Sequence, residues 1–170
     1  MAFHHLALAT TDLAATHRFY TDAMGFTLVH VEDAATDVPD GWLHHVFYDT
    51  GDGTCMAFME LHDERCTHFD PAISRGLGLP AWVNHIAFAV DDLKALDTAL
   101  TRWLAHGHDV VKMRHNHGTS IYTEDPNGML LEFTVDVPNA ADIAADRSGD
   151  AHETLKRWLA GDHTSNNTYR

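Results

Sequence analysis

The sequence predicts an α+β protein made of two βαβββ modules. A repeated stretch carries this prediction: "FHHLALATTDL" near the N-terminus returns as "VNHIAFAVDDL", which aligns His85 with His5 and Asp92 with Asp12. After each copy the residues follow the same order of patterns, an amphipathic helix and then three alternating strands. Internal repetition of this kind indicates a duplicated structural unit, so both halves are expected to share one fold.

The first module is assigned to residues 1–62. Apolar and polar residues alternate at residues 4–10, as in a half-buried strand, and Asp12 stands where a helix N-cap is expected. The apolar stripe of residues 13–24 predicts a helix that Gly25 ends. "TGDGT" predicts a hairpin turn between the last two strands. The other strands are predicted at residues 26–31, 42–49 and 55–61, with a loop at 32–41.

A segment without periodicity, residues 63–81, is interpreted as a linker because "DPAISRGLGLP" within it holds two Pro and two Gly. Residues 82–136 are assigned to the second module, and the two modules are expected to form one domain. Residues 137–170 are assigned to a helical tail, with its best helix at 150–159 and a frayed end from residue 162. The second module is predicted to contain strands at 83–90, 109–114, 119–123 and 129–135, and a helix at 91–105.

The composition argues against several classes of binding partner. The formal net charge of −14 disfavours nucleic acids and anionic membranes. No apolar run is long enough to span a bilayer, and the first residues lack the pattern of a secretory signal. Two cysteines do not suggest a disulfide scaffold. We therefore expect a cytoplasmic protein that acts on a small molecule.

The repeated histidine lies on a strand face of unusual character. Because side chains alternate along a strand, His5 shares its face with Ala7 and Ala9, while Leu6 and Leu8 share the other. The second copy places His85 beside alanines in the same way. The bulky face is suited to packing under a helix, and the alanine face leaves space that a ligand can fill.

Each module also ends with a strand that contains a glutamate, Glu60 in "CMAFMEL" and Glu132 in "MLLEFTV". A carboxylate among apolar residues is costly to bury unless it is paired or binds a cation. A hydrogen-bonded core histidine or an edge glutamate is the ordinary interpretation of each residue alone. Their matched positions in two repeats favour a metal site. Two His and one carboxylate suit iron(II), and two His with two Glu suit nickel, zinc, cobalt or manganese.

Three motifs, "HHLALATTDLAATHRFYTDAMGF", "HIAFAVDDL" and "SIYTEDPNGMLLEF", resemble the vicinal oxygen chelate superfamily over about residues 2–136. This superfamily includes glyoxalase I, extradiol dioxygenases, fosfomycin-resistance proteins and bleomycin-resistance proteins. The resemblance implies that two βαβββ sheets curl into an incomplete barrel around one divalent metal ion. It implies the ligands His5, His85 and Glu132, with Glu60 as a fourth ligand in some branches. It also implies a homodimer, whose modules pair within one chain or swap between two.

The resemblance leaves several branches open. Glyoxalase I uses all four ligand positions, but Ala9 stands where its bacterial forms carry an Arg that helps to bind glutathione. Fosfomycin-resistance proteins have a Thr at the position of Ala7. Extradiol dioxygenases have a Tyr ten residues before the ligand Glu, as Tyr122 stands before Glu132. The alternative outside enzymology is a non-catalytic binding protein of the bleomycin-resistance type.

The expected mechanism assigns roles to four further side chains. In an isomerase or lyase, Glu60 would be a labile ligand that moves a proton. In an iron(II) dioxygenase, His115 or His117 would act as acid or base near neutral pH, and Tyr122 would orient the substrate. Because Lys and Arg are few, a neutral or aromatic substrate is expected. The expected cavity walls are Phe47, Phe58, Trp42 and Tyr122.

Overall fold

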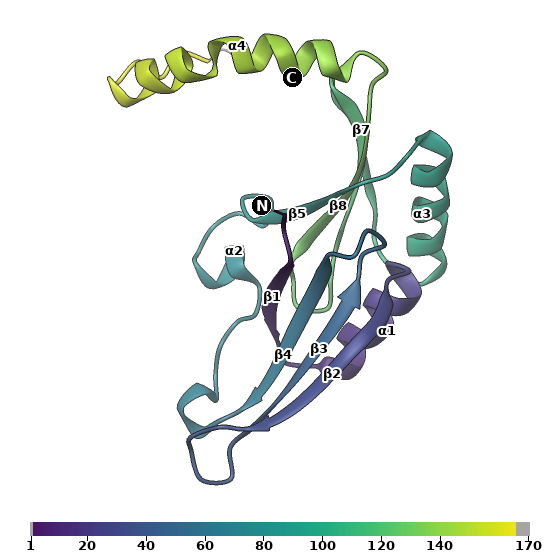
Figure 1. Cartoon of the computed structure of the whole chain (residues 1–170), viewed down its shortest axis with the longest axis vertical. Coiled ribbons are helices and arrows are strands. Elements are labelled where there is room, and N and C mark those ends of the chain that lie inside the picture. Colours follow the sequence, from purple (N-terminus) through teal and green to yellow (C-terminus); the bar gives the residue numbers. More distant parts are fainter. Residues whose placement is uncertain (1, 166–170) are drawn as a thin grey trace.

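The computed structural model describes residues 2–165 and contains two four-stranded mixed sheets, one from each half of the chain (Figure 1). In both sheets the first strand of the module lies parallel to the last, and the other neighbours are antiparallel. This arrangement confirms the predicted pair of βαβββ modules. The first sheet contains β1 (His5–Thr10), β4 (Cys55–His62), β3 (Trp42–Asp49) and β2 (Thr27–Ala35) in that order; the second contains β5 (His85–Ala89), β8 (Leu130–Asp136), β7 (Gly118–Glu124) and β6 (Val111–Arg114).

The helix of each module begins with the same cap. The carboxylate of Asp12 accepts a hydrogen bond of 2.8 Å from the backbone N–H of Ala15, and that of Asp92 accepts one of 2.7 Å from Ala95. Such caps satisfy backbone donors that the first turn of a helix leaves unpaired. The second helix is regular. The first is a short α-helix that continues as a π-helical turn, where one continuous helix was predicted. The ranges are α1 (Leu13–Arg18), η1 (Phe19–Ala23) and α3 (Leu93–Ala105).

Other segments differ from the prediction in length. Strand β2 extends through Ala35, so Glu32 belongs to the sheet and not to the predicted loop. The predicted linker contains a 3₁₀ turn, η2 (Glu64–Cys66), and a short helix, α2 (Ile73–Gly76). The tail forms one continuous helix, α4 (Ala140–Leu159), which extends away from the sheets (Figure 1).

The predicted frayed end begins at residue 162, and its last five residues, 166–170, lie outside the described part. Among residues 2–165, no helix is both long and apolar enough to span a bilayer.

One core joins the two modules through their helix-covered faces. The rings of Phe26 and Phe88 are 5.2 Å apart across the junction. The guanidinium of Arg102 donates hydrogen bonds of 2.6 Å and 2.7 Å to the carbonyl oxygens of Ala23 and Met24. Because the modules pack through these faces, the opposite face of each sheet stays open.

The open faces carry the repeated histidines. Along β1, Leu6 and Leu8 pack against the core, whereas His5, Ala7 and Ala9 are exposed. Along β5, Ile86 and Phe88 pack against the core, whereas His85, Ala87 and Ala89 are exposed. The alternation read from the sequence therefore predicts both faces of both strands correctly.

Candidate metal centre

His85 and Glu132 form a pair on the open face of the second sheet. The parallel register of β5 and β8 aligns Glu132 with Ala87, which lies on the His85 side of the strand. His85 Nε2 lies 3.5 Å from Glu132 Oε2, and Glu132 is only 8% exposed. His85 Nδ1 lies 3.1 Å from the carbonyl oxygen of Trp82. A ring whose Nδ1–H donates to this carbonyl keeps the Nε2 lone pair available for a metal ion.

Tyr122 and His115 extend this pair. The hydroxyl of Tyr122 donates a hydrogen bond of 3.0 Å to Glu132 Oε1, and His115 Nε2 lies 3.2 Å from the same hydroxyl. Burial raises the pKa of Tyr122, so the phenol stays protonated and donates. His117 joins by stacking its ring on His115 at 5.3 Å. The structure thus places Tyr122 against the carboxylate of Glu132, His115 against Tyr122, and His117 against His115.

His5 lies on the open face of the first sheet. Its Nδ1 lies 2.7 Å from Nδ1 of His4, and its ring contacts the ring of Phe47 edge-on at 5.6 Å. Within residues 2–165, no three His, Cys, Asp or Glu side chains come together as a metal site. A single chain therefore does not bring His5 to the His85–Glu132 pair.

Glu60 lies on the other face of the first sheet. The register of β1 and β4 aligns Ala7 with Ala57 and Thr10 with Glu60. Ala57 therefore occupies the position that Glu132 has in the second module. Since side chains alternate, Glu60 shares its face with the core residue Phe58. The strand register does not bring Glu60 to His5, contrary to the expectation from the sequence.

The four aromatic residues expected to line the cavity lie on two different faces of the sheets. Phe47 and Tyr122 lie on the open faces, because the register aligns them with Ala57 and Glu132. Phe58 is fully buried against the ring of Tyr20, at 4.5 Å. Trp42 lies on the Glu60 side of the sheet and stacks on His62. Phe58 and Trp42 therefore do not line the open face.

Three polar side chains on the first sheet were missed by the sequence reasoning: His30, Glu32 and His45. The rings of His30 and His45 lie 5.4 Å and 4.2 Å from that of Phe47, and Glu32 pairs with His45 across the two strands. His45 Nε2 is buried without a hydrogen-bond partner among the described residues. Burial lowers the pKa of His45, partly offset by Glu32. Pairing across β2 and β3 places these side chains on the His5 face. Glu32 was missed because it falls in the predicted loop, whereas His30 and His45 lie in predicted strands whose register the sequence does not give.

Comparison with known proteins agrees with this architecture. The model of the Glyoxalase/Bleomycin resistance protein/Dioxygenase superfamily matches residues 2–133. The uncharacterized protein YaeR of Escherichia coli (strain K12) is 27% identical over 133 residues, which cover 76% of this chain and 92% of YaeR.

Two solved structures have the same fold. Lactoylglutathione lyase from Agrobacterium tumefaciens superposes with a TM-score of 0.53 at 24% identity, covering 79% of this chain and 92% of the lyase. A mutant of the fosfomycin resistance protein FosX from Listeria monocytogenes, complexed with Mn(II) and 1S,2S-dihydroxypropylphosphonic acid, gives a TM-score of 0.57 at 20% identity. That match covers 81% of this chain and 94% of FosX.

Proposed function

Because the chain belongs to the Glyoxalase/Bleomycin resistance protein/Dioxygenase superfamily, we propose that it is a metalloenzyme. Its substrate would be a small organic molecule that chelates one divalent metal ion through adjacent oxygens. The observation that carries this proposal is the His85–Glu132 pair, with Nε2 and Oε2 at 3.5 Å and the second carboxylate oxygen held by Tyr122.

The donor set fits a divalent transition metal. His5, His85 and Glu132 would supply two imidazoles and one carboxylate, a set that suits Fe²⁺ or Mn²⁺ and leaves positions open for a substrate. The Mn(II) complex of FosX supports a metal of this kind. When bound, such an ion would stabilise negative charge on the substrate oxygens as a Lewis acid.

The surrounding residues would orient the carboxylate of Glu132 and exchange a proton with the substrate. Tyr122 holds one oxygen of Glu132, which fixes the direction of the other. Because the phenol proton is donated to Glu132, the Nε2–H of His115 donates to the phenol oxygen, 3.2 Å away. His115 would then exchange a proton with the substrate. With Glu60 on the other face, three ligands favour the iron(II) dioxygenase branch over the four-ligand glyoxalase branch, with Ni²⁺, Zn²⁺ and Co²⁺ as alternatives.

The metal site is proposed to form between two copies of the chain, with His5 from one copy and His85 and Glu132 from the other. Both histidines lie on exposed strand faces, while the modules of one chain pack through their opposite faces. A two-fold homodimer in which these open faces meet would contain two equivalent sites.

A mixing experiment tests both parts of the proposal. His5→Ala and Glu132→Gln are each purified without chelator or affinity tag, and metal is measured by elemental analysis. Each variant alone is expected to lose its metal. Co-expressed, they should regain about a quarter of the wild-type content, because half of the dimers would be mixed and each mixed dimer has one intact site.

The other outcomes are equally informative. No recovery on mixing would place the site within one chain. Metal that is retained in both single variants, or absent from the wild type, would overturn the metalloenzyme proposal and favour a non-catalytic binding protein. Glu60→Gln is the matched control, since its carboxylate lies on the other face, and it should keep the full metal content.

A further inference from the structure

A cavity of about 610 Å³ opens on the open face of the first sheet, where it begins at Ala7, two residues along β1 from His5. Its floor comes from β1, β3 and β4, and its wall from the segment that follows β4. Most of the lining is apolar, from Ala7, Ala9, Met59, Leu61, Leu43 and Phe69, and the polar side chains are those of Arg65, Cys66 and His68 in the wall. The volume lies in the range that small-molecule sites occupy.

The cavity lies next to His5 along β1, on the same face of the strand. Ala7 lies two residues from His5 on the same strand face, a distance of roughly 7 Å along a strand. Met59 aligns with His45 across β3 and β4, so the floor also continues toward that imidazole. A small molecule that is held by its oxygens near His5 would therefore extend its remaining atoms over the alanines and into this cavity.

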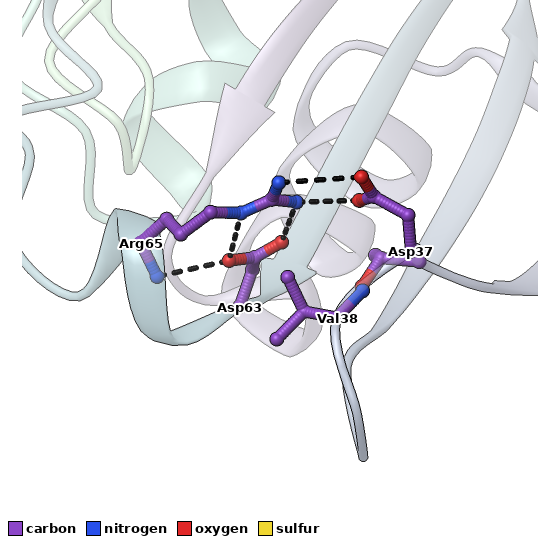
Figure 2. Close-up of polar contacts among 5 residues, drawn as sticks. Asp37, Val38, Asp63 and Arg65 are labelled. Carbon is purple, nitrogen blue, oxygen red and sulfur yellow. Dashed lines mark hydrogen bonds and ion pairs between the residues drawn. The ribbon is translucent and has the colours of Figure 1, made fainter.

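The guanidinium at the cavity wall is already paired. Figure 2 shows Arg65 between two carboxylates: its Nη2 lies 2.6 Å from Asp63 Oδ2 and 2.6 Å from Asp37 Oδ1. The Nε–H also donates to Asp63 Oδ1 at 2.9 Å, and so does the backbone N–H of Arg65. Two carboxylates neutralise this cation and accept hydrogen bonds from its N–H groups. The guanidinium therefore does not offer a free positive charge to an anionic ligand.

We infer that this cavity is the subsite for an uncharged apolar substituent, aromatic or alkyl, of the substrate that the metal chelates. This inference rests on the proposed function and adds the substrate class to it. The apolar floor stabilises such a substituent by removing it from water. An anionic substituent would lose its hydration against Ala, Leu and Met, with the nearby cation already occupied and a chain charge of −14 around it.

Two probes with the same aromatic skeleton test the subsite. N-phenyl-1-naphthylamine is neutral, and 8-anilino-1-naphthalenesulfonate adds one sulfonate. In fluorescence titrations of the purified protein, the neutral probe should saturate one site per chain. The sulfonate should bind at least about tenfold more weakly, because of its desolvation. Equal affinities for the two probes would overturn the inference.

Variants locate the site of binding. Met59→Asp should weaken binding of the neutral probe by about tenfold or more, since it places a charge in the cavity floor. Met113→Asp is the matched control, because Met113 is an exposed methionine of the second sheet, 48% accessible against 37% for Met59. Asp37→Asn removes one partner of Arg65 at an exposed position and should selectively strengthen sulfonate binding. Equal losses in both methionine variants would overturn the inference.

A final titration connects the subsite to the metal. With metal-loaded protein, 4-tert-butylcatechol should displace the neutral probe at concentrations at least about tenfold lower than catechol, since its alkyl group would enter the cavity. Equal displacement would overturn the inference. Repeating the probe titrations after chelator treatment separates the two proposals. If the protein proves to hold no metal, the neutral probe should still bind and Met59→Asp should still weaken it.

Discussion

The two modules share a backbone plan but differ at one equivalent position on their last strands. In the second module Glu132 lies beside His85, fixed by Tyr122 and extended by His115. In the first module the register gives Ala57 at that position, beside Phe47. The strand histidine is thus present in both modules, whereas the carboxylate and its hydrogen bonds are present in only one.

This difference suits the two modules to different roles in the proposed function. A carboxylate and an imidazole held together form most of a metal site, and in the second module they lie on adjacent strands. A small alanine in place of the carboxylate gives the first module an open face that can accept a substrate. On that face lie His30, His45 and the apolar cavity. Under the proposed function, the second module holds the metal, and the first adds one ligand and binds the organic part of the substrate.

The sharpest test of these different roles replaces one glutamate in each module by glutamine. Glu132→Gln should lower the affinity for Mn²⁺ by about 100-fold or more, because the proposed metal ligand loses its charge. Glu60→Gln should leave the affinity unchanged, since Glu60 shares a face with Phe58. Isothermal titration of Mn²⁺ into metal-free protein measures both. Similar losses in the two variants would show that Glu60 is a ligand and that the modules act alike.

A smaller effect is expected when the hydrogen bond that supports the proposed ligand Glu132 is removed. Tyr122→Phe removes the donor to Glu132 Oε1 and should lower Mn²⁺ affinity by about tenfold, as loss of an outer-shell partner does. Tyr48→Phe is the matched control. Its hydroxyl lies 3.1 Å from His17 Nδ1, and Tyr48 is fully buried in the core. The same titration serves both variants. An unchanged affinity in Tyr122→Phe would show that Glu132 needs no support.

The sequence predicts elements and faces well because both depend on local patterns. Strand β3 has the predicted bounds, and the alternation of His5 with Leu6 places both residues correctly. The failure at Glu60 has a different origin. Which residue of β4 lies beside His5 depends on the parallel register between strands about fifty residues apart, and a local pattern does not fix that register. The glutamate of "FMEL", Glu60, therefore lies three residues beyond Ala57, which occupies the ligand position.

The other omissions also reflect long-range structure. Glu32 falls in a polar stretch that reads as a loop, but pairing with β3 extends β2 through it. Local propensity is weaker than such pairing. The separation of His5 from Glu132 within one chain depends on how the modules pack, which no motif encodes. The repeat therefore indicates candidate residues, and the packing decides which of them lie together.

The smallest expected effect concerns the wall of the first module's cavity. Hydrogen bonds from Arg65 lower the pKa of Asp63 to about 2 from an ordinary value of 3.8. A carboxyl with a lowered pKa in the folded state contributes stability that is fully present above the unfolded pKa. That stability is lost as the pH falls through the folded pKa.

Asp63→Asn should therefore lower the urea midpoint of unfolding at pH 6, by about 0.3 M for a partly exposed pair. The gap between wild type and variant should close as the pH falls from about 4 toward about 2, because the wild-type carboxylate is then protonated as well. The variant should also strengthen binding of the anilinonaphthalenesulfonate probe at pH 6, since Arg65 loses a partner. A gap that stays constant with pH would show that Asp63 supports the cavity wall by shape and not by charge.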